Sequence, residues 1–76
     1  MTINTTMLDE MNLILQFPTD SLRTGLKVHQ DAPEVTVAAA QRLYDKGLTD
    51  APDGGYLTDA GIELHEHLLV LHSALK

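Results

Sequence analysis

The chain has no cysteine and no tryptophan, and its 76 residues include one phenylalanine and two tyrosines. The absence of cysteine excludes a disulfide framework, a thiolate nucleophile and any cysteine-ligated metal site. Aromatic side chains make up 4% of the chain, so its core must come from aliphatic residues and methionine. A chain of this length predicts one domain over residues 1–76 with a thin core, for which oligomerisation is a common remedy.

Positive charge is scarce as well. Five Lys and Arg residues stand against eleven Asp and Glu residues, and the formal net charge is −6. Strong non-specific binding to nucleic acid depends on cations that neutralise phosphates, so this balance argues against it. Four of the five cations fall in the middle of the chain, at Arg23, Lys27, Arg42 and Lys46.

Long apolar runs are also missing. The longest one, Leu68–Leu71, is far shorter than the roughly 20 residues that a membrane-spanning helix needs. Residues 1–6 lack the basic and then apolar layout of a signal peptide. We therefore expect a soluble, cytoplasmic protein that does not contact a membrane.

The apolar residues that are present follow helical spacing in the first third of the chain. One helix is predicted over residues 7–17, where Met7, Met11 and Ile14 share a face and Pro18 ends the helix. A second helix is predicted over residues 21–29, anchored by Leu22 and Leu26.

Two further helices are predicted in the rest of the chain. The third runs from Pro33, a residue suited to the first turn, to Lys46, and Gly47 follows as its C-terminal cap. The fourth is capped by Thr58 and continues to about Leu75.

A short β-hairpin is predicted between the third and fourth helices. Its strands are residues 48–50 and 56–58. In the turn, Pro52 fixes its own φ while Gly54 and Gly55 supply positive φ. If residues 48–58 formed an irregular loop instead, the fold would be a plain four-helix bundle.

Three helices, a hairpin and a closing helix make the layout of a winged helix-turn-helix domain, which is the predicted, mainly α fold class. Over residues 32–64 the sequence resembles bacterial regulators of the multiple-antibiotic-resistance type. The full length also resembles a short bacterial family sometimes labelled DNA-binding. The positions that carry the resemblance to the regulators are Pro33, Leu43, Lys46, Gly47, Leu48, Leu57, Thr58, Asp59 and Gly61.

This resemblance implies a DNA-binding transcriptional regulator that acts as a homodimer on double-stranded DNA. In such regulators the helix over residues 33–46 would enter the major groove and the hairpin would form a wing beside it. The candidate DNA-binding residues are Arg23, Lys27, Gln41, Arg42, Lys46 and Tyr56.

Other residues favour a different function. The tip of the hairpin carries Asp50 and Asp53, and the would-be recognition helix exposes Val35, Val37 and Ala38. The alternative is an acidic protein–protein interaction module that does not bind DNA. The basic pairs spaced four residues apart either clamp phosphates or pair with nearby carboxylates.

The histidines do not form a metal motif. His65 and His67 point in directions about 200° apart on a helix, so they cannot share one ion. No nucleophile motif or phosphate-binding glycine loop is present in the sequence. We expect neither an enzyme nor a cofactor or metal site.

A homodimer is predicted from the last helix. Its leucines at positions 64, 68, 71 and 75 form one stripe that we expect to face the core. A second apolar side of the helix would then be left for a partner. The predicted interface residues are Ile62, His65, Leu69 and His72.

Overall fold

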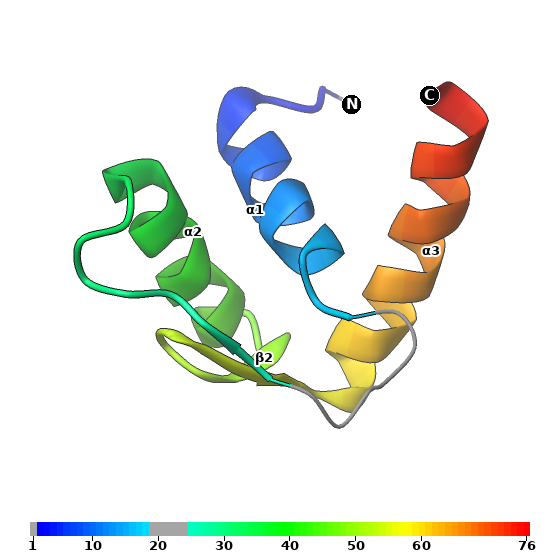
Figure 1. Cartoon of the computed structure of the whole chain (residues 1–76). Coiled ribbons are helices and arrows are strands. Elements are labelled where there is room, and N and C mark those ends of the chain that lie inside the picture. The colour runs from blue at the N-terminus through cyan, green and yellow to red at the C-terminus, as the bar shows by residue number, and fades with distance from the viewer. Residues whose placement is uncertain (1, 19–24) are drawn as a thin grey trace.

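The computed structural model of the chain describes residues 2–18 and 25–76 (Figure 1). These residues form a mainly α domain with three helices and an antiparallel sheet of three short strands. The elements in chain order are α1 (Thr5–Leu15), β1 (Leu26–Lys27), α2 (Glu34–Asp45), β2 (Thr49–Ala51), β3 (Gly54–Leu57) and α3 (Asp59–Leu75).

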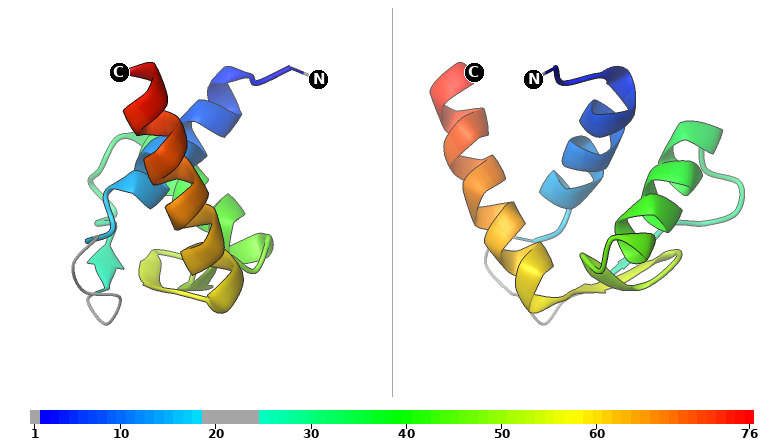
Figure 2. Two further views of the ribbon diagram at one scale, coloured as in Figure 1. Left: turned by 90° about the vertical axis from the view of Figure 1, so that its right-hand side faces the viewer. Right: turned by 180° about the vertical axis from the view of Figure 1, so that it is seen from behind.

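Helix α1 lies between α2 and α3 and contacts both of them (Figure 1). The sheet covers the end of the molecule at which α3 begins. Near the sheet α1 and α3 come close together, and they diverge toward the two ends of the chain (Figure 2). The outer halves of these two helices are therefore separated from each other.

The buried core lies mainly between α1 and α2. Leu13 and Ile14 of α1 pack with a group of α2 residues that recur at helical spacing and are completely buried. Two members of that group are alanines, whose small side chains allow the two helices to approach closely. The group consists of Ala39, Ala40 and Leu43, and Val28 and Leu68 complete the core cluster.

Local sequence signals define the ends of the helices. Helix α1 begins two residues earlier than predicted, because the side chain of Asn4 accepts a 2.9 Å hydrogen bond from the Met7 N–H. The predicted cap of α3 is confirmed, since the Thr58 side chain accepts a hydrogen bond from the Gly61 N–H. After α2, Gly47 has a φ of 77°, which lets the Leu48 N–H bond back to the Leu43 carbonyl at 2.9 Å.

The predicted hairpin is confirmed. Strands β2 and β3 pair in antiparallel register, with Thr49 opposite Leu57 and Ala51 opposite Gly54. The two glycines at positions 54 and 55 have the positive φ expected of them. Because this cross-strand pairing exists, the plain four-helix bundle is excluded.

The predicted helix over residues 21–29 is wrong from residue 25 onward, while residues 21–24 lie outside the described residues. Leu26 and Lys27 form β1, which pairs with β3 and gives the strand order β1-β3-β2. The Val28 N–H donates a 2.8 Å hydrogen bond to the Asp53 carbonyl and extends this pairing. No described residue between β1 and α2 is helical, so the predicted second helix, the first of a helix-turn-helix pair, is absent from residues 25–29. The two-stranded wing becomes part of a three-stranded sheet.

The predicted core stripe of α3 is correct at one end only. Leu68 is buried and Leu64 is partly buried, but Leu71 and Leu75 are 38% and 77% exposed. The buried side of α3 is centred on Gly61, His65 and Leu68 instead. Helix α3 has 17 residues and α1 has 11. Because the two helices also diverge, the C-terminal turns of α3 extend beyond the core (Figure 2).

Candidate functional site

The basic residues expected to contact DNA are engaged within the protein wherever the structure describes them. Lys27 of β1 forms an ion pair with Asp53, in the turn between β2 and β3. The hydrogen bond from Lys27 holds the pKa of the Asp53 carboxyl below its usual value of 3.8. Arg23, the other candidate in this part of the chain, lies outside the described residues.

Arg42 of α2 and Lys46, its C-terminal cap, both reach toward α1. The Lys46 ammonium lies 2.5 Å from Oε1 of Glu10, and Nε of Arg42 lies 3.5 Å from the same oxygen. Arg42 also donates a long, 3.4 Å hydrogen bond to the Thr6 carbonyl. Glu10 is 7% exposed, so these two cations neutralise a carboxylate that α1 buries against α2.

The two uncharged DNA-binding candidates are exposed. Gln41 lies on α2, and its amide donates a 3.0 Å hydrogen bond to Asp45 one turn later. Tyr56 on β3 is half exposed, and its backbone N–H donates to the Asp50 carboxylate at 2.8 Å. Both residues therefore have a carboxylate beside them.

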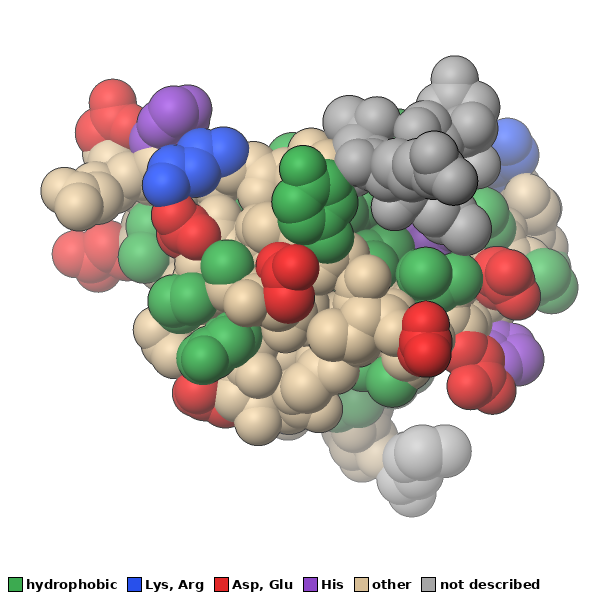
Figure 3. All heavy atoms as spheres, turned by 90° about the horizontal axis from the view of Figure 1, so that it is seen from below, with side chains coloured by type: hydrophobic (Ala, Val, Ile, Leu, Met, Phe, Trp, Pro, Cys, Tyr) green, Lys and Arg blue, Asp and Glu red, His purple; other side chains and the backbone are tan. Residues whose placement is uncertain are grey.

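The sheet end of the molecule is acidic on its surface. In the view from below, Asp and Glu side chains are spread across the face, and Lys and Arg side chains come into view toward its upper margin (Figure 3). The described charges on this face repel phosphate more than they attract it.

The residues predicted for a dimer interface have three different environments. His65 is 2% exposed, and its Nε2 lies 3.1 Å from the Phe17 carbonyl, which fixes the end of α1 to α3. Ile62 and Leu69 are half-buried on the flanks of α3. His72 is exposed and lines a groove between α1 and α3.

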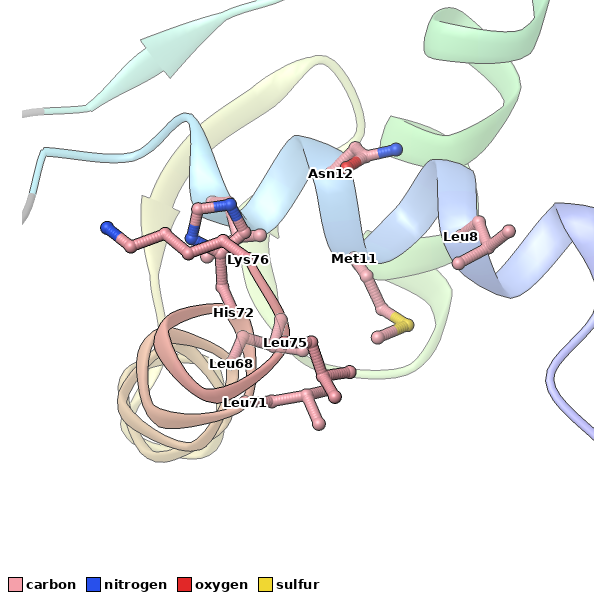
Figure 4. Close-up of a pocket in the computed structure, with 9 residues that line it drawn as sticks. Leu8, Met11, Asn12, Leu68, Leu71, His72, Leu75 and Lys76 are labelled. Atoms are coloured by element: carbon pink, nitrogen blue, oxygen red, sulfur yellow. The ribbon is translucent and has the colours of Figure 1, made fainter.

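That groove is apolar and lies between the two diverging helices, and we call it the α1–α3 groove. Leu8 and Met11 point from α1 toward the space into which Leu71 and Leu75 project from α3 (Figure 4). Its volume is about 260 Å³. The full set of lining residues is Leu8, Met11, Asn12, Leu15, Leu68, Leu71, His72, Leu75 and Lys76.

A second apolar hollow of about 310 Å³ adjoins the groove, because Met11 and Leu68 line both. It lies where α1, α2 and α3 meet the N-terminal residues, and Ile3 and Met7 at its edge are exposed. Together the two hollows make a continuous apolar surface along α1. In the sequence, this apolar surface is indicated by apolar residues on several sides of α1 and α3. Which of those sides is exposed depends on how the two helices diverge in the fold.

The chemistry of the groove suits contact with other apolar side chains. Six of the nine lining residues are Leu or Met, and the polar ones lie at its rim and at the C-terminal end of α3. At about 260 Å³ it is smaller than the roughly 300–1,000 Å³ of pockets that enclose a small ligand. Across residues 2–18 and 25–76, no three His, Asp or Glu side chains are grouped to hold a metal ion.

Within the described part of the chain, no helix combines the length and apolar character needed to span a bilayer. Comparison with the curated proteins gave no match, and comparison with the solved structures gave none either. A family model does match, and it covers residues 1–76. The chain thus belongs to a family of unknown function, DUF5669.

Proposed function

We propose that this protein is a protein–protein interaction module whose α1–α3 groove binds an apolar helix of its partner. The observation that carries the proposal is one groove with large apolar side chains on both sides, of which Leu8, Leu71 and Leu75 are exposed while Met11 is partly buried. Leu8 and Met11 contribute the α1 side, and Leu71 and Leu75 contribute the α3 side. Contiguous apolar surface rimmed by polar residues is typical of a surface that another protein covers.

The ion pairs support this proposal over DNA binding. Lys27, Arg42 and Lys46 are each beside a carboxylate of the same chain. A phosphate would have to compete with Asp53 or Glu10 for these cations, so each would contribute little to the counterion release that drives DNA binding. The net charge of −6 also opposes DNA binding.

Sequence-specific DNA binding is the second candidate function. It is favoured by the order α2, β2, β3, α3, because the hairpin follows directly after the helix that resembles a recognition helix. Gln41 and Tyr56 are exposed on those two elements and have side chains that can contact bases or phosphates. Its support is thus the arrangement of elements together with two uncharged side chains.

Site-specific crosslinking in the cell tests the proposed function. A photoreactive benzoylphenylalanine at position 71, inside the groove, should give a discrete adduct of higher mass upon irradiation. The matched control is the same group at exposed Glu66, which lies about 140° around α3 from Leu71. Adduct formation from position 71 but not from position 66 supports the proposal, and its absence from position 71 contradicts it.

A further inference from the structure

The C-terminal half of α3 packs little within its own protomer. After Leu68, the apolar residues Val70, Leu71 and Leu75 are all exposed. In isolation, one helix gains little from propensity, and most helical stability in proteins comes from packing of an apolar side. The last two turns of α3 therefore require a surface that the same protomer does not supply.

From this geometry we infer that the occupant of the α1–α3 groove is a second copy of the chain, bound in a symmetric homodimer. This inference rests on the proposed function and names the partner of the same site. In a two-fold arrangement one surface meets its own copy, so the leucines of α3 from each protomer would enter the groove of the other. Leu71 and Leu75 are both part of the groove and exposed on its rim, which makes this surface complementary to itself.

The protomer exposes more area than a compact monomer of its mass. A compact monomer of 8.3 kDa is expected to expose about 4,600 Å² by the general scaling of surface with mass. This chain exposes 5247 Å². The difference is roughly 650 Å², close to the roughly 800 Å² that each partner buries in a standard protein–protein interface. This excess is summed over the whole chain, so it indicates a protomer open enough for a partner of standard size, and the apolar groove is where we place that partner.

The charges of the groove also suit a second copy. Two copies that each carry a net charge of −6 repel one another least when they meet at a face without carboxylates. The nine lining residues include no Asp or Glu, and the charged residue among them, Lys76, lies at the end of α3. Because no carboxylate lines the α1–α3 groove, two copies of this acidic chain can associate there with little local repulsion.

The inferred interface differs from the one that the sequence predicted. His72 remains in it because this residue lines the groove. His65 is excluded because it is buried within the protomer. Leu71 and Leu75, which the sequence placed in the core, become the main contacts.

Sedimentation of the full chain tests the inference. Near neutral pH and over about 1–100 μM, the wild-type chain should sediment with a mass that approaches twice 8.3 kDa as its concentration rises. Leu75→Glu should raise the dimer dissociation constant at least about 100-fold, because each dimer loses two buried leucines. Leu75 is 77% exposed, so this variant should keep the circular dichroism spectrum and melting temperature of a folded protomer.

Leu71→Glu is the second variant, and Glu66→Gln on the other side of α3 is the matched control. Leu71→Glu should weaken the dimer as Leu75→Glu does, and Glu66→Gln should leave it intact. A wild-type chain that stays monomeric at the highest concentration overturns the inference, and so does a Leu75→Glu variant that dimerises normally. If the chain is monomeric while crosslinking from position 71 captures another protein, the groove remains an interaction site and only the identity of its occupant is wrong.

Discussion

Among single residues, Glu10 joins two helices through a nearly buried carboxylate. It comes from α1, is nearly buried, and accepts two cations that α2 contributes 32 and 36 positions later in the sequence. The pairing explains why Arg42 and Lys46 share one side of α2, as their spacing predicted. It also gives them a function in joining two helices, which leaves less charge for an external anion.

Replacing Glu10 should therefore destabilise the protein. In Glu10→Gln the carboxylate is lost while Arg42 and Lys46 remain beside an uncharged amide. Because Lys46 is 54% exposed and water screens part of the attraction, we expect a loss of about 1–2 kcal/mol in the free energy of unfolding.

Urea unfolding measures this loss, and Glu63→Gln is its control. Glu63 forms an exposed pair with His67 on α3, so its replacement should change the free energy of unfolding by less than about 0.5 kcal/mol. Equal effects of the two substitutions would show that burial of Glu10 contributes nothing.

At the scale of elements, the sequence predicts those structures whose signals are local. Pro33 and Gly47 bracket α2, Thr58 caps α3, and the proline and glycines of the turn produce the hairpin. Strand β1 was missed because Leu26 fits a helical spacing and its two-residue strand is defined by pairing with β3, about 28 positions away. Only the distant partner reveals that this segment is extended.

In the candidate site, too, some features follow from local sequence patterns and others depend on the packing of distant elements. The apolar character of α1 and α3 can be seen in the sequence, and the prediction of a dimer rests on that of α3. Which leucines are exposed cannot be predicted from the sequence, because their exposure depends on the angle between α1 and α3. A shift of the buried side from the predicted stripe to Gly61 and His65 was enough to move Leu71 and Leu75 from the core to the surface.

The ion pair between β1 and the hairpin predicts a pH dependence. The hydrogen bond from Lys27 favours the charged form of Asp53 and lowers its pKa below 3.8. A depressed pKa in the folded state means that the stabilisation is complete above the unfolded pKa and is lost as the pH falls through the lower, folded value. The pair should therefore support the β1–hairpin contact at neutral pH and release it in acid.

Titration of the Asp53 carboxyl by NMR measures this effect. The midpoint should lie below 3.8 in the wild-type chain and should rise toward the usual value in Lys27→Met. The control is Lys46→Met, which removes a cation paired with Glu10 instead and should leave the Asp53 midpoint at its wild-type value. An Asp53 midpoint that is the same in the wild-type chain and in Lys27→Met would contradict the pairing.

At the scale of the whole molecule, charge and shape separate the two candidate functions. The acidic surface and the internally paired cations oppose binding to DNA, whereas the groove supports binding to protein. We expect no binding of the wild-type chain to mixed duplex DNA in a fluorescence anisotropy titration, even at about 10 mM salt where the electrostatic attraction is strongest. Binding that weakens steeply with added salt would contradict this and restore DNA as the ligand.

The central claim is that α1 and α3 form the surface at which this protein meets its partner, and that the partner is a second copy. Isotope-filtered NMR on an equal mixture of labelled and unlabelled chains tests it most directly, at about 1 mM protein so that even a weak complex is populated. The account predicts intermolecular contacts between the methyl groups of Leu71 or Leu75 in one copy and those of Leu8 or Met11 in the other. Contacts that instead connect the hairpin or α2 of two copies, or no intermolecular contacts at all, would contradict it.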